Sequence, residues 1–150
     1  MDHEQNIDLA SGFSAFEAKH FSRAMQLLAP HAQAGNAEAQ YRLGIMYQNG
    51  LGTVHNPALA FRWMQEAAQQ GHGLAHHGLG FMYLEGSCVD QSDSKAADCF
   101  TQGVEQGLEG SMMALAQLYE EGRGVEKDRD RAWSLYQQAG LMEPKISSPE

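Results

Sequence analysis

Small and apolar residues recur along the chain at a constant spacing of 36 residues. The residues that repeat in this way are Gly35, Gly71 and Gly107; Leu43, Leu79 and Leu115; Tyr47, Tyr83 and Tyr119; Gly50, Gly86 and Gly122; and Ala60, Ala96 and Ala132. So many positions in phase, without a gap, indicate three consecutive copies of one structural unit.

Each unit contains two stretches in which apolar residues follow the period of an α-helix. In the first unit Ala39, Leu43, Met46 and Tyr47 recur at helical spacing, which places them on one face. A glycine ends this stretch, and a residue with a short polar side chain begins the next one. The pattern predicts first helices at 37–49, 73–85 and 109–121, and second helices at 57–70, 93–106 and 129–139.

One helix pair cannot bury its own apolar face, so neighbouring pairs are expected to stack into an array with a continuous core. A further pair of helices is predicted at 5–18 and 22–34, ahead of the three units. Small residues, such as Gly44 and Gly80, occupy positions where the helices must approach closely. The pattern therefore predicts an all-α solenoid made of helical hairpins.

The repeated unit resembles the Sel1-like repeat family, which is related to tetratricopeptide repeats. In the first unit the matching residues are Ala39, Leu43, Gly44, Tyr47, Gly50, Gly52, Asn56, Ala60 and Trp63. The second unit departs at Cys88, where the family has a loop glycine, so we expect that loop to be distorted. The segment before residue 35 is instead similar to a plain tetratricopeptide unit.

The resemblance implies a right-handed α-solenoid and suggests how the chain is divided. The expected units are a tetratricopeptide-like unit at 5–34, Sel1-like repeats at 35–70, 71–106 and 107–140, and a disordered tail at 141–150. Similar proteins serve as adaptors and regulators, many of them bacterial. The resemblance implies protein binding and no cofactor.

In tetratricopeptide-like solenoids the first helix of each pair lines a concave groove, and four positions of that helix point into it. Transferring these positions to the present sequence predicts the partner-binding residues Phe13, Phe16, Glu38, Tyr41, Ile45, Gln48, Leu74, His77, Phe81, Leu84, Met113, Gln117 and Glu120. Much of this stripe is apolar, which is typical of a groove for a helix or an extended peptide. The alternative interpretation is that the array curls tightly and these residues pack on one another.

The charge of the chain narrows the choice of partner. The formal net charge is −9, which disfavours nucleic acid as a partner because the phosphate backbone is also negative. Most of the excess lies in residues 85–131, which hold 11 acidic and 5 basic residues, whereas residues 35–84 are neutral. A protein with a basic segment is therefore the expected partner.

The two ends of the chain suggest where the protein is located and whether it forms a dimer. The N-terminus lacks the basic and apolar regions of a secretory signal, and no apolar run approaches the roughly 18 residues of a membrane span, so we expect a cytoplasmic protein without membrane contact. Residues Trp133, Leu135, Leu141 and Met142 form an apolar C-terminal edge. Either the tail folds back over this edge and the protein is a monomer, or the edge forms a weak homodimer or a contact with a partner.

Two sets of residues suggest other chemistry. His72 and His76 are four positions apart, a spacing used in zinc sites, but HGLAH lacks the glutamate of HExxH and no third ligand follows. Ordinary surface or groove histidines are the preferred interpretation, and His77 in the groove would make binding sensitive to pH. Cys88 and Cys99 either remain thiols or form a disulfide, and neither has a clear histidine partner for nucleophilic catalysis.

We therefore expect an adaptor or regulator that holds a protein partner in a concave groove. A second hypothesis is an immunity protein or antitoxin that neutralises a basic toxin. A third is a structural component of an envelope or motility complex. An enzyme that uses the histidine cluster is disfavoured.

Overall fold

The computed structural model describes residues 3–140, and this part of the chain consists of eight α-helices without a β-strand. The helices are α1 (His3–Glu17), α2 (Phe21–Gln33), α3 (Ala37–Asn49), α4 (Pro57–Gln69), α5 (Gly73–Glu85), α6 (Asp93–Glu105), α7 (Glu109–Glu121) and α8 (Arg129–Gln138). Their bounds agree with the predicted ranges to within two residues. The predicted all-α solenoid is confirmed.

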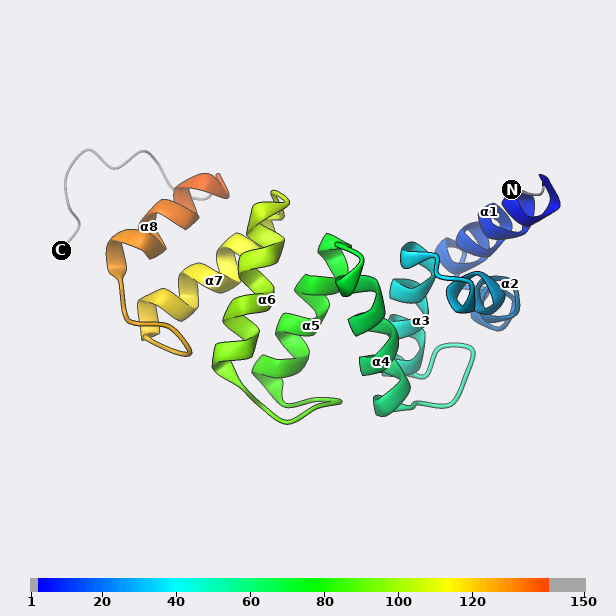
Figure 1. The fold of residues 1–150 in the computed structure, drawn as a ribbon, viewed down its shortest axis with the longest axis horizontal. Helices are drawn as coiled ribbons and strands as arrows, with labels where there is room; N and C mark the ends of the chain where they lie inside the picture. Colours follow the sequence, from blue (N-terminus) through cyan, green and yellow to red (C-terminus); the bar gives the residue numbers. More distant parts are fainter. Residues whose placement is uncertain (1–2, 141–150) are drawn as a thin grey trace.

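Consecutive helices pair into hairpins, and the hairpins stack side by side into a bowed row (Figure 1). The second helix of each hairpin contacts the first helix of the next hairpin. These contacts join α2 to α3, α4 to α5, and α6 to α7. The apolar interior is divided into three clusters along this row rather than gathered at one centre. Each hairpin thus completes its core by contact with its neighbours, as expected of a repeat array.

The ends of the helices are set by local sequence signals. The side chains of Asn36, Asn56, Ser92 and Asp128 each accept a hydrogen bond from the backbone N–H three residues later. This bond satisfies a donor that would otherwise be unpaired at the first turn of the helix. At the other end, α3, α5 and α7 each stop at a glycine with a left-handed backbone. The predicted N-caps of the second helices are confirmed.

The loop between α5 and α6 contains Cys88 where the other two loops have glycine. The φ angle of Cys88 is +68°, close to the values of +69° at Gly52 and +72° at Gly124. The turn therefore keeps its left-handed conformation, and the distortion expected from the missing glycine is not found in this angle. The Cys88 side chain packs against the central apolar cluster together with Val89.

At the same step of 36 residues, two glutamines bond the end of a hairpin to the glycine that precedes its first helix. The Nε2 atom of Gln70 donates to the carbonyl of Gly35 at 2.9 Å, and that of Gln106 donates to the carbonyl of Gly71 at 2.7 Å. Gln40, which is buried, donates to the carbonyl of Ala32 at 3.0 Å. These side chains supply partners to backbone carbonyls near the ends of the helices.

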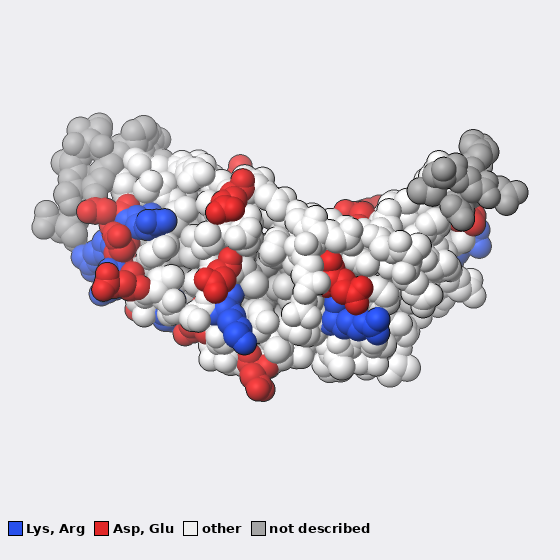
Figure 2. Space-filling model, viewed as in Figure 1, with Lys and Arg blue, Asp and Glu red and all other residues white. Residues whose placement is uncertain are grey.

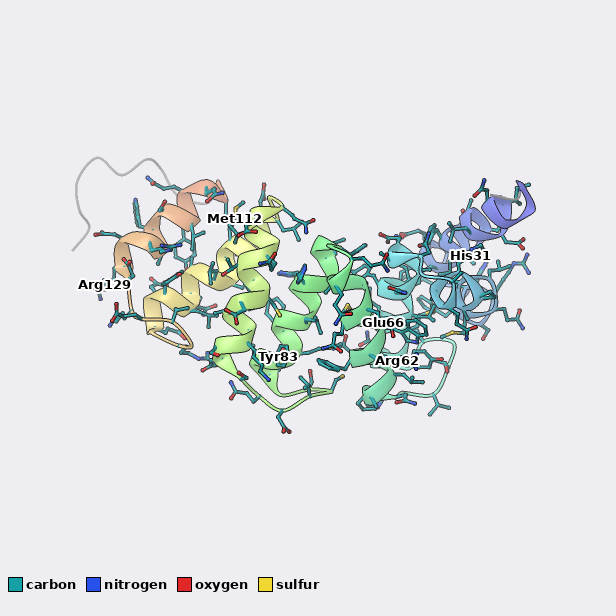
Figure 3. All side chains as sticks on the ribbon, viewed as in Figure 1. His31, Arg62, Glu66, Tyr83, Met112 and Arg129 are labelled. Carbon is teal, nitrogen blue, oxygen red and sulfur yellow. The ribbon has the colours of Figure 1, made fainter. Side chains whose placement is uncertain are left out.

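Charged side chains are unevenly distributed over the molecule. Figure 2 shows more of them over the left, C-terminal half of the visible face than over the right half. On α4, Arg62 and Glu66 lie one turn apart and form an ion pair of 3.0 Å (Figure 3). Within residues 3–140 no helix has the length and apolarity required to cross a bilayer.

The predicted C-terminal edge is described only in part. Leu135 is buried and Trp133 is half-buried within the last hairpin. Leu141, Met142 and the predicted tail at 141–150 lie outside the described residues.

Candidate functional site

The first helices of the four hairpins, α1, α3, α5 and α7, carry all the predicted partner-binding residues, and we call the surface that they form the inner surface. None of these residues is fully buried. Half-buried are Phe13, Phe16, Glu38, Tyr41, Ile45, Gln48, His77, Phe81 and Leu84; exposed are Leu74, Met113, Gln117 and Glu120. Leu74 and Met113 are 45% and 44% exposed, which is high for large apolar side chains.

A pocket of about 460 Å³ opens on the inner surface between α5 and α7. It is lined by His77, Phe81, Leu84, Gly110, Met113, Ala114, Gln117, Leu118, Arg123 and Tyr136. Five of these residues belong to the predicted binding set. We call this space the α5–α7 pocket.

Aromatic rings form the floor of the α5–α7 pocket. The centroid of the Phe81 ring lies 5.0 Å from that of His77 and 5.0 Å from that of Phe100. Phe100 comes from α6 and is fully buried, so it supports the other two rings from below. Edge-to-face pairs of this kind are favourable, and they hold the floor in one arrangement.

His77 also connects α5 to α7. Its Nδ1 atom lies 2.8 Å from the hydroxyl oxygen of Ser111, which is fully buried. A Cβ atom at Gly110 would lie 3.1 Å from the His77 ring. The absence of a side chain at Gly110 therefore keeps the space above His77 open, whereas the corresponding position one repeat earlier holds Leu74.

Partial burial lowers the pKa of His77 below its ordinary value of 6.5, because the charged imidazolium would lose solvation in the pocket floor. Burial also lowers the pKa of His76, although its hydrogen bond to the backbone of Ala68 opposes this effect. Both rings are therefore neutral at pH 7.

The lowered pKa values of His76 and His77 predict that the protein becomes less stable as the pH falls from 7.5 to 5.5. Below about pH 6.5 the unfolded chain binds protons at His76 and His77 more readily than the folded chain does, so the free energy of unfolding decreases. Urea unfolding at several pH values, followed by circular dichroism, should show this slope. The His77→Gln variant should have a smaller slope, and equal slopes for variant and wild type would contradict the prediction.

The rim of the pocket at the end of α7 is charged. Arg123 contacts Asp93 at 3.1 Å and Glu121 at 3.5 Å, and the Tyr136 hydroxyl donates to Glu120 at 3.0 Å. Burial and the neighbouring Glu120 carboxylate raise the pKa of Tyr136, so its hydroxyl remains protonated and can donate. This rim thus combines three carboxylates with one guanidinium group.

A second cluster lies on the inner surface where α1, α3 and α5 meet. The guanidinium group of Arg42 lies over the Phe16 ring, 4.7 Å from its centroid, and bonds to Glu38 at 2.7 Å and to Glu17 at 2.6 Å. The other carboxylate oxygen of Glu38 lies 2.7 Å from Nε2 of His72. Polar groups in this cluster already have partners within the chain, which makes it less suited than the pocket to receive another molecule.

The electrostatics of this cluster centre on Glu38. Its partial burial opposes ionisation, but the hydrogen bonds from His72 and Arg42 outweigh that effect and lower the pKa of Glu38 below 4.5. His72 also stacks on Tyr41, with ring centroids 4.8 Å apart. The predicted residues Glu38 and Tyr41 thus meet in one network.

The structure gives each candidate histidine a separate partner. Nδ1 of His72 accepts from the backbone N–H of Ala75 and caps α5, so its Nε2 carries the proton that Glu38 accepts. His76 bonds to a backbone group, and His77 bonds to Ser111. Within residues 3–140 no three histidine, cysteine or acidic side chains form a group suited to a metal ion.

Both cysteines are free thiols in the structure. Burial and the nearby Asp98 carboxylate raise the pKa of Cys99 to about 11, and burial raises that of Cys88. Because the thiolate is the reactive form, neither side chain is activated as a nucleophile at neutral pH.

Sequence reasoning missed part of the pocket. Tyr136 belongs to the second helix of its hairpin and Arg123 to the loop after α7, whereas the predicted positions came from first helices only. The apolar spacing within α8 is the one signal that could have directed attention to Tyr136.

Comparison with known proteins identifies the family. A model of the Sel1 repeat matches residues 37–72, 73–108 and 110–143. Among solved structures, a protective antigen of uropathogenic Escherichia coli that displays an SLR fold is 31% identical with a TM-score of 0.85; the match covers 91% of this chain and 30% of that one. A Sel1 repeat protein from Oxalobacter formigenes is 30% identical with a TM-score of 0.85, covering 89% of this chain and 53% of that one.

Cysteine rich protein B of Helicobacter pylori shares the fold at 18% identity and a TM-score of 0.63, covering 81% of this chain and 86% of that one. No curated protein matches the chain. The present chain spans only part of the length of the first two structures. Since the repeat model matches well over half of its residues, the chain belongs to the Sel1 repeat family.

Proposed function

We propose that this chain is an adaptor or regulator that holds a segment of a partner protein on its inner surface and anchors it in the α5–α7 pocket. Sel1 repeat proteins generally mediate interactions between proteins, which supports this class of function. The observation that carries the proposal is the open pocket itself, whose apolar floor faces solvent between two helices.

The pocket suits one large apolar side chain of a partner. Its volume of about 460 Å³ falls in the range of pockets that hold small-molecule ligands, roughly 300–1,000 Å³, so it has room for a large side chain. Phe81 supplies an aromatic floor, and Met113 offers a flexible thioether that can adapt to the shape of the inserted group. Anchor residues that fill such pockets usually provide most of the binding energy at protein interfaces.

A hydrolytic role is disfavoured by the position of Ser111. This residue lies within hydrogen-bond distance of His77, as a nucleophilic serine would lie from its base. Its side chain is fully buried, however, and a substrate carbonyl cannot reach the hydroxyl oxygen. The pair instead fastens α5 to α7 beneath the pocket.

The proposal predicts that Met113→Gln weakens partner capture by on the order of tenfold, because a buried apolar contact is replaced by an amide that must lose water. The test is affinity capture from a lysate of the native organism, with quantitative mass spectrometry of the bound proteins. The side chain is exposed, so the helical circular dichroism should be unchanged.

The matched control is Val54→Gln, which alters an apolar side chain that is 83% exposed in the loop after α3. This variant should retain every specific partner of the wild-type chain. The proposal fails if Met113→Gln and the pocket-floor variant Phe81→Leu both retain the same partners at wild-type levels.

A further inference from the structure

The rim of the α5–α7 pocket carries more negative than positive charge. Arg123 is the basic residue among those lining the pocket, and its charge is shared between Asp93 and Glu121. Glu120 accepts from the neutral hydroxyl of Tyr136 and has no cationic partner among residues 3–140. Two carboxylates thus contact one guanidinium group beside the pocket, and the third, that of Glu120, bonds to the Tyr136 hydroxyl instead.

The C-terminal end of α7 makes the electrostatic potential at the rim more negative. Glu120 and Glu121 are the last two residues of α7, and the final turn of this helix contains no basic residue. Helix C-termini carry partial negative charge on their unpaired carbonyl groups, so acidic residues there are electrostatically unfavourable. A cation brought to this end of α7 would interact favourably with the carboxylates and with the carbonyl groups together.

The acidic rim and the apolar α5–α7 pocket lie on the same side of α7. Met113, Gln117 and Glu120 recur at intervals of four and three residues, which places them along one face of the helix. A separation of seven residues corresponds to about 10 Å along the helix axis. An extended peptide covers this distance in about three residues.

We infer that the occupant of the pocket is a basic segment of a partner protein, which inserts one large apolar side chain between Phe81 and Met113 and places a lysine or arginine two to four residues away against Glu120. This inference rests on the proposed function and specifies the chemistry of the partner. The wider surface agrees with it, because residues 85–131 hold 11 acidic and 5 basic residues.

The first experiment is selection from a random 12-residue peptide library displayed on phage, with the immobilised full chain as the target. Peptides that also bind the Met113→Gln variant are removed by counter-selection. The enriched peptides should combine a large apolar residue with lysine or arginine at the stated spacing.

The second experiment measures the affinity of a synthetic consensus peptide by fluorescence anisotropy at 50 mM and 300 mM NaCl. The Glu120→Gln variant should bind about three- to fivefold more weakly at low salt, and the difference should shrink at high salt. Glu105→Gln is the matched control, because Glu105 is exposed on α6 and does not line the pocket. A peptide whose basic residue is changed to glutamine should not distinguish Glu120→Gln from the wild type.

Peptides that require Met113 but lack basic residues would overturn this inference and leave the proposed function intact. The same conclusion follows if Glu120→Gln and the wild type bind the basic peptide equally. Failure to enrich any pocket-dependent peptide would also count against the inference, while the separate capture experiment with Met113→Gln decides whether the proposed function stands.

Discussion

Replacing Phe100 with alanine should lower the free energy of unfolding by about 3–5 kcal/mol, the largest loss expected from a single side chain in this protein. Phe100 is the largest of the fully buried side chains. Its ring contacts Phe81 and His77, and a Cβ atom at Gly80 would lie only 2.5 Å from it. The surrounding helices are therefore fitted closely to this ring, and its removal leaves a cavity that they cannot readily fill.

Urea unfolding followed by far-ultraviolet circular dichroism measures this loss. A suitable comparison is Phe61→Ala, because Phe61 is only half-buried on α4 and packs its ring against Tyr83. The Phe61 variant should lose clearly less stability, since much of its ring is already in contact with water. A loss below about 1 kcal/mol for Phe100→Ala would show that this part of the core is not closely packed.

The second large effect is expected at Gly124, in the loop after α7. Its φ angle is +72°, and a Cβ atom there would lie 2.3 Å from the carbonyl oxygen of Asp93, at the start of α6. Alanine at this position would incur the left-handed penalty of about 1–2 kcal/mol and a clash with backbone atoms that costs roughly 1–3 kcal/mol more. We expect Gly124→Ala to lower the thermal unfolding midpoint strongly.

Gly107 provides the control that separates these two contributions. Its φ angle is +80°, but a Cβ atom there would have no neighbour within 4 Å. Gly107→Ala should therefore show the left-handed penalty alone. Cys88 demonstrates that the equivalent turn accepts a side chain where space allows. Equal losses for the two alanine variants would mean that contact with α6 does not restrain the loop.

The helices and their ends were predictable because the signals that determine them are local. Asn56 caps α4 through its own side chain, and Gly50 ends α3 by adopting a backbone that other residues avoid. The 36-residue spacing then required every unit to share one architecture. Neither inference depends on which side chains meet across the array.

The candidate site was only partly predictable because it depends on contacts between repeats. The register transferred from tetratricopeptide-like solenoids placed Phe81 and Met113 in a groove, and both residues line the α5–α7 pocket. It could not show that Arg42 reaches across to the rings of α1, because this long side chain has many conformations and only the assembled structure selects one. The 36-residue register placed His72 just before the predicted helix 73–85, at the position of Asn36, but it gave no indication that the imidazole would accept the capping hydrogen bond.

The stacking of hairpins in chain order has a consequence for how this site can be inherited. Every residue that lines the α5–α7 pocket lies between His77 and Tyr136, so one uninterrupted stretch of sequence encodes the entire cavity. Duplication or exchange of that stretch would carry the pocket into another solenoid without rearranging the remainder. The pocket is therefore a portable feature of two adjacent repeats.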